Sequence, residues 1–326
     1  MIMKTLLLLS SRAQALQTFK FSGNPYSSRT DLSRTVGKVR TQEDDNEASP
    51  FFTDYVFPEQ RGKYPFFLFL TGFYGMAPEF TYDEMLSDFA KKGWVIAAST
   101  TLNHREDKKN ETVWDDMWDW HLEHAQHVIS EGDRHNIEID FDRIVLGCQS
   151  AGCETLKYFA NTKTDKISAF WMLDPVPMLN DAGKETVYHE VTSSAAVMIE
   201  STEFCGPCCI GKWANEPLFN SFVSSDVKMF EDQLHTGHCS CLNTLDAKMC
   251  GFMCNAGEED DEHYNGRNYL RKVHACDAGK VTAFFADALW NDSKMRDYYQ
   301  NSNEHCGIEV VDELTRKCQG PKCLGW

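Results

Sequence analysis

The sequence predicts an α/β fold with a mostly parallel central sheet, helices on both faces of that sheet, and a cysteine-rich C-terminal extension. Short apolar runs alternate with longer amphipathic stretches, which is typical of strands alternating with helices. A strand, a tight turn and a helix are predicted around Ser150. Eleven of the 13 cysteines lie between Cys205 and Cys323. These three observations predict both the fold class and the part of the chain that carries chemistry.

Length and composition fit one large α/β domain or two small domains. The chain has 326 residues, and 42% of them are hydrophobic and 12% aromatic, which excludes a disordered class. The net charge of −17 argues against a nucleic-acid partner and against electrostatic docking to anionic lipid. The charge leaves an apolar substrate and peripheral contact with a membrane open. Nothing in the composition indicates an oligomeric state.

Four segments are expected along the chain. Residues 1–18 resemble a targeting segment, since Lys4 precedes an apolar stretch and Ala13-Gln14-Ala15 follows it. This segment predicts a plastid or the secretory pathway. Residues 19–50 are expected to be a flexible arm, 51–297 the α/β domain, and 298–326 a cysteine-containing tail. No other segment approaches the roughly 18 apolar residues that a membrane span needs.

The first half of the domain alternates strands and helices. The run Tyr64–Leu70 is almost continuously apolar, as in a strand of a parallel sheet that is buried on both faces. Gly93 follows an amphipathic stretch and is expected to end a helix there. The elements expected are an edge strand over Asp54–Pro58, a strand over Tyr64–Leu70, a helix over Glu79–Lys92 and a strand over Trp94–Ala98.

The second half continues the alternation. A helix is expected over Thr112–Ser130, where His121, His124 and His127 repeat every third residue. No acidic or cysteine partner completes a metal-binding spacing, so packing is favoured over a metal face. The other expected elements are strands over Arg143–Gly147, Ile167–Leu173 and Ala195–Glu200, and a helix over Val281–Trp290.

The clustered cysteines have two interpretations. They form disulfides that fasten long loops in an oxidising compartment, or they form a metal site or a redox Cys-x-x-Cys. Paired Cys-x-x-Cys units with a partner at the distance of a zinc finger are not evident in the sequence, so disulfides are favoured. Because the number of cysteines is odd, at least one thiol is free or bonded to another chain.

Ser150 is the candidate nucleophile. The apolar run Arg143–Gly147 leads to it, and Gly152 follows, so the serine lies at a sharp turn between a strand and a helix. Cys148 occupies the position two residues before the serine, where the usual Gly-x-Ser-x-Gly motif has glycine. The alternative is a strand end whose serine caps the following helix.

A serine hydroxyl needs a base, and the base needs an orienting carboxylate. In α/β-hydrolase chain order the acid follows the serine and the histidine comes last. Asp174 fits as the acid, at the end of an apolar strand, although an Asp-Pro turn would explain it as well. His238 fits as the base because Gly237 frees the backbone before it, and His235 is its rival.

Backbone N–H groups must stabilise the oxyanion of an acyl-transfer reaction. The residue after the nucleophile, Ala151, is expected to supply one of them. The loop Thr71–Gly75 follows the early buried strand and is expected to supply the second. Phe73 is preferred as that donor, with Tyr74 as the alternative.

These residues together resemble chlorophyllases, a plant and algal branch of the α/β-hydrolase fold. The resemblance lies in Tyr64-Pro-Phe-Phe-Leu-Phe-Leu-Thr-Gly-Phe73, in Leu173-Asp-Pro-Val176 and in Gly237-His238. It implies Asp174 as the acid of a Ser-His-Asp triad. The chain departs from the family at Cys148-Gln-Ser-Ala-Gly-Cys153, where the family has Gly-His-Ser-Arg-Gly-Gly, and at Thr71, where it has histidine. A divergent, algal-type member is therefore expected.

The resemblance implies hydrolysis of the phytyl ester of chlorophyll to chlorophyllide and phytol, without a cofactor held by the protein and without a metal site. The magnesium arrives with the pigment. A generic lipase or carboxylesterase and a non-catalytic binding protein of the same fold remain as alternatives. The side chains expected to bind the hydrophobic ester, or else to belong to the core, are Tyr74, Met76, Met172 and Met178.

Overall fold

The computed structural model describes residues 36–41, 52–72, 77–100, 111–130, 137–176, 190–204, 212–254, 267–301, 304, 306 and 310–311. These residues form one nine-stranded sheet in the order β1-β2-β4-β3-β5-β6-β7-β8-β9. The strands are β1 Val36–Thr41, β2 Phe52–Pro58, β3 Gly62–Leu70, β4 Val95–Thr100, β5 Ile137–Gln149, β6 Ile167–Leu173, β7 Ala196–Phe204, β8 Lys228–Gly237 and β9 Val310–Val311.

The central six strands are parallel. β3 pairs in parallel with β4 and β5, and β5 to β8 follow in parallel succession. The pairs β1–β2, β2–β4 and β8–β9 are antiparallel. The predicted α/β class with a mostly parallel sheet is confirmed. Because the carboxyl ends of parallel strands meet at one edge, the loops after β3, β5, β6 and β8 converge there.

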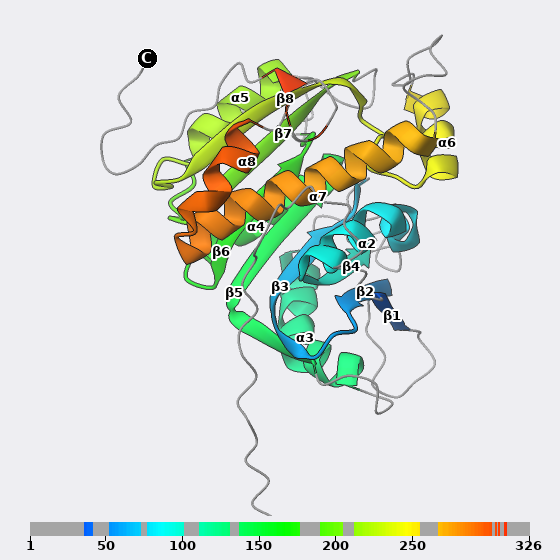
Figure 1. Ribbon diagram of the computed structural model, residues 1–326. Helices are drawn as coiled ribbons and strands as arrows, with labels where there is room; N and C mark the ends of the chain where they lie inside the picture. The colour runs from blue at the N-terminus through cyan, green and yellow to red at the C-terminus, as the bar shows by residue number, and fades with distance from the viewer. Residues whose placement is uncertain are drawn as a thin grey trace, which may run out of the picture.

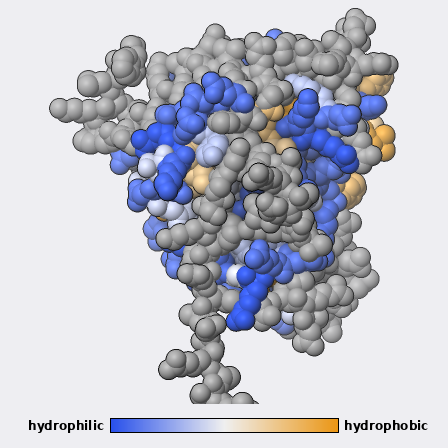
Figure 2. All heavy atoms as spheres, viewed as in Figure 1, coloured by the Kyte–Doolittle hydropathy of each residue, from blue (hydrophilic) through white to orange (hydrophobic). Residues whose placement is uncertain are grey.

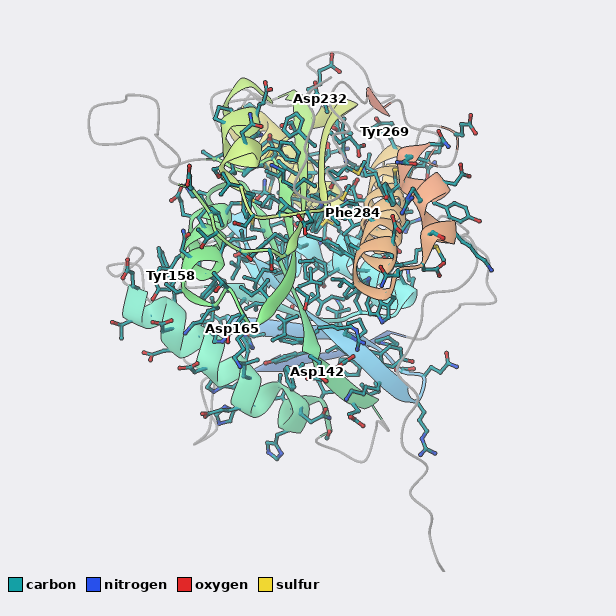
Figure 3. The ribbon with its side chains drawn as sticks, turned by 90° about the vertical axis from the view of Figure 1, so that its left-hand side faces the viewer. Asp142, Tyr158, Asp165, Asp232, Tyr269 and Phe284 are labelled. Carbon is teal, nitrogen blue, oxygen red and sulfur yellow. A yellow bond between two sulfur atoms is a disulfide. The ribbon has the colours of Figure 1, made fainter. Side chains whose placement is uncertain are left out.

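Helices cover both faces of the sheet (Figure 1). In Figure 3 Tyr158 of α4 and Phe284 of α7 lie on opposite sides of the strands. One buried cluster joins the sheet to α2 and α7, and the other joins it to α3, α4 and α5. The helices are α2 Asp83–Lys92, α3 Glu111–Ser130, α4 Cys153–Thr162, α5 Lys212–Ser221, α6 Thr244–Cys254, α7 Arg267–Trp290 and α8 Arg296–Gln300, with short 3₁₀ turns at Glu79–Tyr82, Ser150–Gly152 and Ser293–Met295.

The apolar run of β3 shows why the sheet lies at the centre. Successive side chains point to opposite faces of a strand. Phe67 and Phe69 therefore pack in the cluster with α2 and α7, whereas Phe66 and Leu68 pack in the cluster with α3 and α4. All four are at most 1% exposed. Each such side chain contributes about 1.5–3 kcal/mol by its burial, so both helical layers depend on this strand.

Two expectations for the N-terminal region are wrong. β2 was expected at the edge of the sheet, but it pairs with both β1 and β4. The strand at the edge is β1, which lies within the 19–50 segment expected to be a flexible arm. The short sequence Val36–Thr41 mixes charged, small and apolar residues and shows no strand pattern of its own. Its strand conformation depends on pairing with β2.

Helix α7 is longer than its apolar pattern indicates. A helix was expected from Val281, but α7 begins at Arg267. The part of α7 before Val281 carries His274, Asp277 and Lys280, which are polar and yet at most 1% exposed. Because these buried polar residues interrupt the apolar periodicity, the sequence pattern predicts a shorter helix than the structure has.

The C-terminal residues are fastened to the domain. Cys306 forms a disulfide with Cys276 of α7. β9 pairs with β8, and α8 crosses the expected boundary between residues 297 and 298. The described part of the tail is therefore continuous with the sheet and with α7. Within the described ranges, no helix combines the length and the apolar character that crossing a bilayer requires.

The histidine-containing helix α3 uses His121 for packing. Its ring is fully buried and hydrogen-bonds to Tyr55 Oη at 2.8 Å and to Ser99 Oγ at 2.6 Å. Burial lowers the pKa of His121 to about 3, and His124 adds a smaller effect in the same direction. His124 instead stacks on Trp120. His121 is therefore a neutral link between α3 and the strands β2 and β4.

Candidate active site

Ser150 lies at a strained turn at the carboxyl end of β5. Its φ of 54° is in the left-handed region, which residues other than glycine rarely adopt. Such a conformation costs about 1–3 kcal/mol and persists where surrounding structure holds it. Gly152 makes the turn possible, because a Cβ there would lie 2.3 Å from the Thr71 carbonyl oxygen. The turn therefore packs directly against the end of β3.

His238 joins Ser150 to Asp174. Its Nε2 lies 2.9 Å from Ser150 Oγ, and its Nδ1 hydrogen-bonds to Asp174 Oδ2. In the neutral imidazole this places the Nδ1 proton toward the carboxylate and leaves Nε2 to accept the serine hydroxyl proton. All three side chains are at most 7% exposed. A hydrogen-bonded chain of this kind can deprotonate a hydroxyl as it attacks a carbonyl carbon.

Asp174 is held by the loops around it. Like Ser150, it has a positive φ, of 44°. Thr202 Oγ1 donates to its Oδ2 at 3.0 Å, and its own N–H donates to the Glu200 carbonyl at 2.6 Å. The N–H of Val176 donates to the Ser150 carbonyl at 3.1 Å. The loop after β6 is thus bonded both to β7 and to the turn that carries the serine.

The structure brings Ser150, Asp174 and His238 together, and Ala151 follows the serine in the same buried turn. His235 lies in β8, and its side chain is outside the described residues. Phe73, Tyr74, Met76 and Met178 also lie outside them. The side chain of Met172 is fully buried in the cluster that joins the sheet to α3, α4 and α5, which agrees with the core alternative for this residue.

Two polar residues that the sequence analysis did not single out contact this site. Gln149 immediately precedes the serine, and its Nε2 donates to the His238 carbonyl at 3.0 Å. Tyr82 donates from its hydroxyl to Gln149 Oε1 at 3.0 Å. Gln149 could have been recognised as a site residue because it is a polar residue at the end of an apolar strand. Tyr82 lies 67 residues away from Gln149 in sequence, so no local pattern connects them.

A disulfide spans the turn of Ser150. It joins Cys148, the last residue but one of β5, to Cys153, the first residue of α4. From the motif alone, Cys148 was expected only to be a small residue in place of glycine. Disulfides were expected in the later cluster, and the described residues include two of them there, Cys239–Cys250 and Cys276–Cys306. The first of these begins directly after His238.

Cys241 is a free cysteine among the described residues, and it lies near the base. Burial raises the pKa of its thiol well above the usual range. The thiol is thus neutral and unreactive at neutral pH. No group of three or more histidine, cysteine or acidic side chains within the described ranges is arranged to hold a metal ion.

Removing the Cys148–Cys153 disulfide is expected both to slow the reaction of Ser150 and to destabilise the fold. The loop that it closes spans 5 residues, so its loss in a Cys148→Ala/Cys153→Ala variant is expected to cost about 2 kcal/mol of unfolding free energy. The turn would lose one of its constraints, and fluorophosphonate labelling should slow by about tenfold or more. Chemical denaturation and labelling kinetics measure the two effects.

The Cys276–Cys306 disulfide provides the matched control. Its separation of 30 residues predicts a larger loss of stability, about 3.6 kcal/mol, for Cys276→Ala/Cys306→Ala. This variant should nevertheless react with the probe at the parental rate. Equal labelling rates in both double variants would show that the disulfide around Ser150 does not support its geometry.

The comparisons with known proteins agree with the geometry. The chlorophyllase family model matches residues 28–193, which is just over half of the chain and includes Ser150 and Asp174. His238 lies outside the matched residues, so its place in the site depends on its hydrogen bonds alone. A search of curated proteins finds no match. The strand order, the strained serine turn and the family match lead to one conclusion: the chain belongs to the chlorophyllase family.

Proposed function

We propose that this protein is a serine hydrolase that cleaves a hydrophobic carboxylic ester, with chlorophyll as the substrate and chlorophyllide and phytol as the products. Membership of the family implies ester hydrolysis at the family level. The single observation that carries the assignment of residues is the hydrogen bond from Ser150 Oγ to His238 Nε2, at a serine of positive φ.

In the proposed reaction Ser150 Oγ attacks the ester carbonyl carbon while His238 Nε2 takes its proton. Asp174 holds the ring and stabilises the resulting imidazolium. We expect the oxyanion to accept hydrogen bonds from the N–H groups of Ala151 and Phe73. The bond between the former carbonyl carbon and the ester oxygen then breaks, which leaves the acyl group on Ser150 Oγ, and His238 gives the proton to the leaving alkoxide.

Water completes the cycle. His238 takes a proton from the water as its oxygen attacks the acyl carbon bonded to Ser150. The second tetrahedral intermediate expels Ser150 Oγ, which regains the proton from His238. The acid leaves as the second product. No redox step and no cofactor enters this sequence, and the magnesium of chlorophyll belongs to the substrate.

Labelling with a fluorophosphonate tests the proposed function. The purified protein should be labelled on Ser150, and Ser150→Ala should abolish the label. Chlorophyll a, a short p-nitrophenyl ester and a triglyceride then separate the substrate classes. Preferred turnover of chlorophyll supports the chlorophyllase assignment, and preferred turnover of the triglyceride supports a lipase. Absence of labelling in the folded wild type would indicate a non-catalytic binding protein.

Targeting and membrane contact stay predictions for this chain. Three disulfides lie within the described residues, which supports an oxidising compartment. The described surface is largely hydrophilic in Figure 2, with apolar side chains at the right-hand edge, where α6 lies in Figure 1. On α6 the exposed residues Leu245, Met249 and Phe252 follow the spacing of one helix face.

A further inference from the structure

We propose that Gln149 and Tyr82 are positioning residues that hold three active-site loops in register: the loop after β3, the turn after β5 and the loop after β8. This inference rests on the proposed function, because it assigns roles around the same serine and histidine. It concerns residues that do not exchange protons with the substrate. The connection consists of three hydrogen bonds, two between a side chain and the backbone and one between two side chains.

The chain of hydrogen bonds begins at the loop after β3. The N–H of Gly72 donates to Tyr82 Oη at 2.9 Å, and Tyr82 Oη donates to Gln149 Oε1 at 3.0 Å. Burial raises the pKa of Tyr82 well above its usual range, so its hydroxyl keeps the proton that it donates. Gly72 directly precedes Phe73, the expected oxyanion donor, so this bond fixes the start of that loop.

The chain ends at the base. Gln149 Nε2 donates to the His238 carbonyl at 3.0 Å and lies 3.3 Å from His238 Nε2. The serine hydroxyl is nearer to the same ring nitrogen, at 2.9 Å. An amide N–H cannot accept a proton from the imidazolium. Gln149 therefore occupies one side of the ring without competing with the leaving alkoxide for that proton.

Close packing makes these contacts specific. A Cβ at Gly72 would lie 2.3 Å from Gln149 Oε1 and 3.1 Å from Tyr82 Oη. Gln149 is 4% exposed and Tyr82 1% exposed, so water cannot readily replace their hydrogen bonds. Displacement of catalytic groups by about 1 Å can lower a rate by about 100-fold. Loss of this connection is therefore expected to appear in kcat.

The test compares Tyr82→Phe and Gln149→Ala with Gln126→Ala. Gln126 also bridges two elements, since its side chain bonds to the backbone of Ile137 at 2.9 Å and of Ile139 at 2.8 Å. With a p-nitrophenyl ester, the first two variants should lose about 10- to 100-fold in kcat with KM changed less than threefold. Gln126→Ala should keep its kcat.

The isosteric variant Gln149→Glu adds a readout that a purely structural role would not change. Its carboxylate would face His238 Nε2 and favour the protonated ring. The rising limb of the pH profile of kcat/KM should therefore move to higher pH. Tyr82→Phe should leave that limb of the pH profile in place. Because it removes only one hydroxyl, it still tests the positioning role if Gln149→Ala does not fold.

The outcomes separate the two proposals. An unlabelled wild type would overturn the proposed function itself. A wild type labelled on Ser150, with Tyr82→Phe and Gln149→Ala keeping the kcat of Gln126→Ala, would overturn only the positioning role. An unmoved pH profile in Gln149→Glu would show that residue 149 does not face the base during turnover.

Discussion

Replacing Asp174 with asparagine is expected to lower kcat on a short p-nitrophenyl ester by about 10⁴-fold, as the equivalent change does in serine proteases. Asp174 is fully buried, and its Oδ2 hydrogen-bonds to His238 Nδ1. An asparagine amide carries no charge to stabilise the imidazolium. Its N–H₂ group, turned toward Nδ1, would also favour the wrong tautomer of the ring. Steady-state kinetics measure the loss.

Two control variants make this result specific. Thr202→Val removes the 3.0 Å hydrogen bond to Asp174 Oδ2 but keeps the charge, so it should lose less than about 100-fold. Glu200→Gln changes another buried carboxylate near this loop. The backbone carbonyl of Glu200, which accepts a hydrogen bond from the Asp174 N–H, stays in the variant. If Glu200→Gln lost 10⁴-fold in kcat and Asp174→Asn less than tenfold, the assignment of the acid would be wrong.

The sequence was most informative where one element determines its own conformation. The run Tyr64–Leu70 gave a buried parallel strand because every residue in it is apolar or aromatic, and the structure places it at the centre of the sheet. The strand Ile167–Leu173 was predicted with the bounds that β6 has. The order of Ser150, Asp174 and His238 along the chain followed from the order of strands in the fold.

The sequence was least informative where contacts join distant segments. The Tyr82–Gln149 hydrogen bond and the pairing of β1 with β2 depend on tertiary structure, so neither has a local pattern. The disulfide at Ser150 was missed for a different reason. Cys148 was compared with the glycine of a motif, and that comparison concealed its five-residue spacing to Cys153. For the same reason, no function was predicted for Gln149, which occupies the histidine position of that motif.

Replacing Lys280 with methionine is expected to give the largest loss of stability in the described part of the chain. Lys280 Nζ is fully buried and lies 2.5 Å from both Glu200 Oε1 and Glu231 Oε1. Although burial lowers the pKa of Lys280, the charges of Glu200 and Glu231 raise it well above the usual range. Methionine would leave two carboxylates buried without their cation, at a cost of about 3–5 kcal/mol or more.

The same substitution on the surface is the matched control. Lys91 Nζ lies 2.7 Å from Asp88 Oδ1, but the lysine side chain is 48% exposed. Lys91→Met should change the unfolding free energy by less than about 1 kcal/mol. Because Lys280→Met can fail to fold, a triple variant with Glu200→Gln and Glu231→Gln should recover much of the loss by removing both buried charges. Denaturant unfolding compares all of these proteins.

Asp277, which lies beside the buried Lys280, is expected to make the stability of the protein depend on pH. Burial, with the charge of Glu200 next, raises its pKa well above the usual range, and its Oδ2 has no hydrogen-bond partner among the described residues. The folded protein therefore holds a proton on Asp277 that the unfolded chain releases above pH ~4. The free energy of unfolding should therefore decrease as pH rises above that value.

Asp277→Asn keeps a neutral side chain at every pH, so its stability relative to the wild type should increase as pH rises above ~4. A constant difference between pH 4 and pH 8 would show that Asp277 is ionised in the folded protein. Lys280 would then balance three buried carboxylates, and Lys280→Met should cost more than it does beside a neutral Asp277. A loss in Lys280→Met no larger than in Lys91→Met would contradict the buried ion pairs themselves.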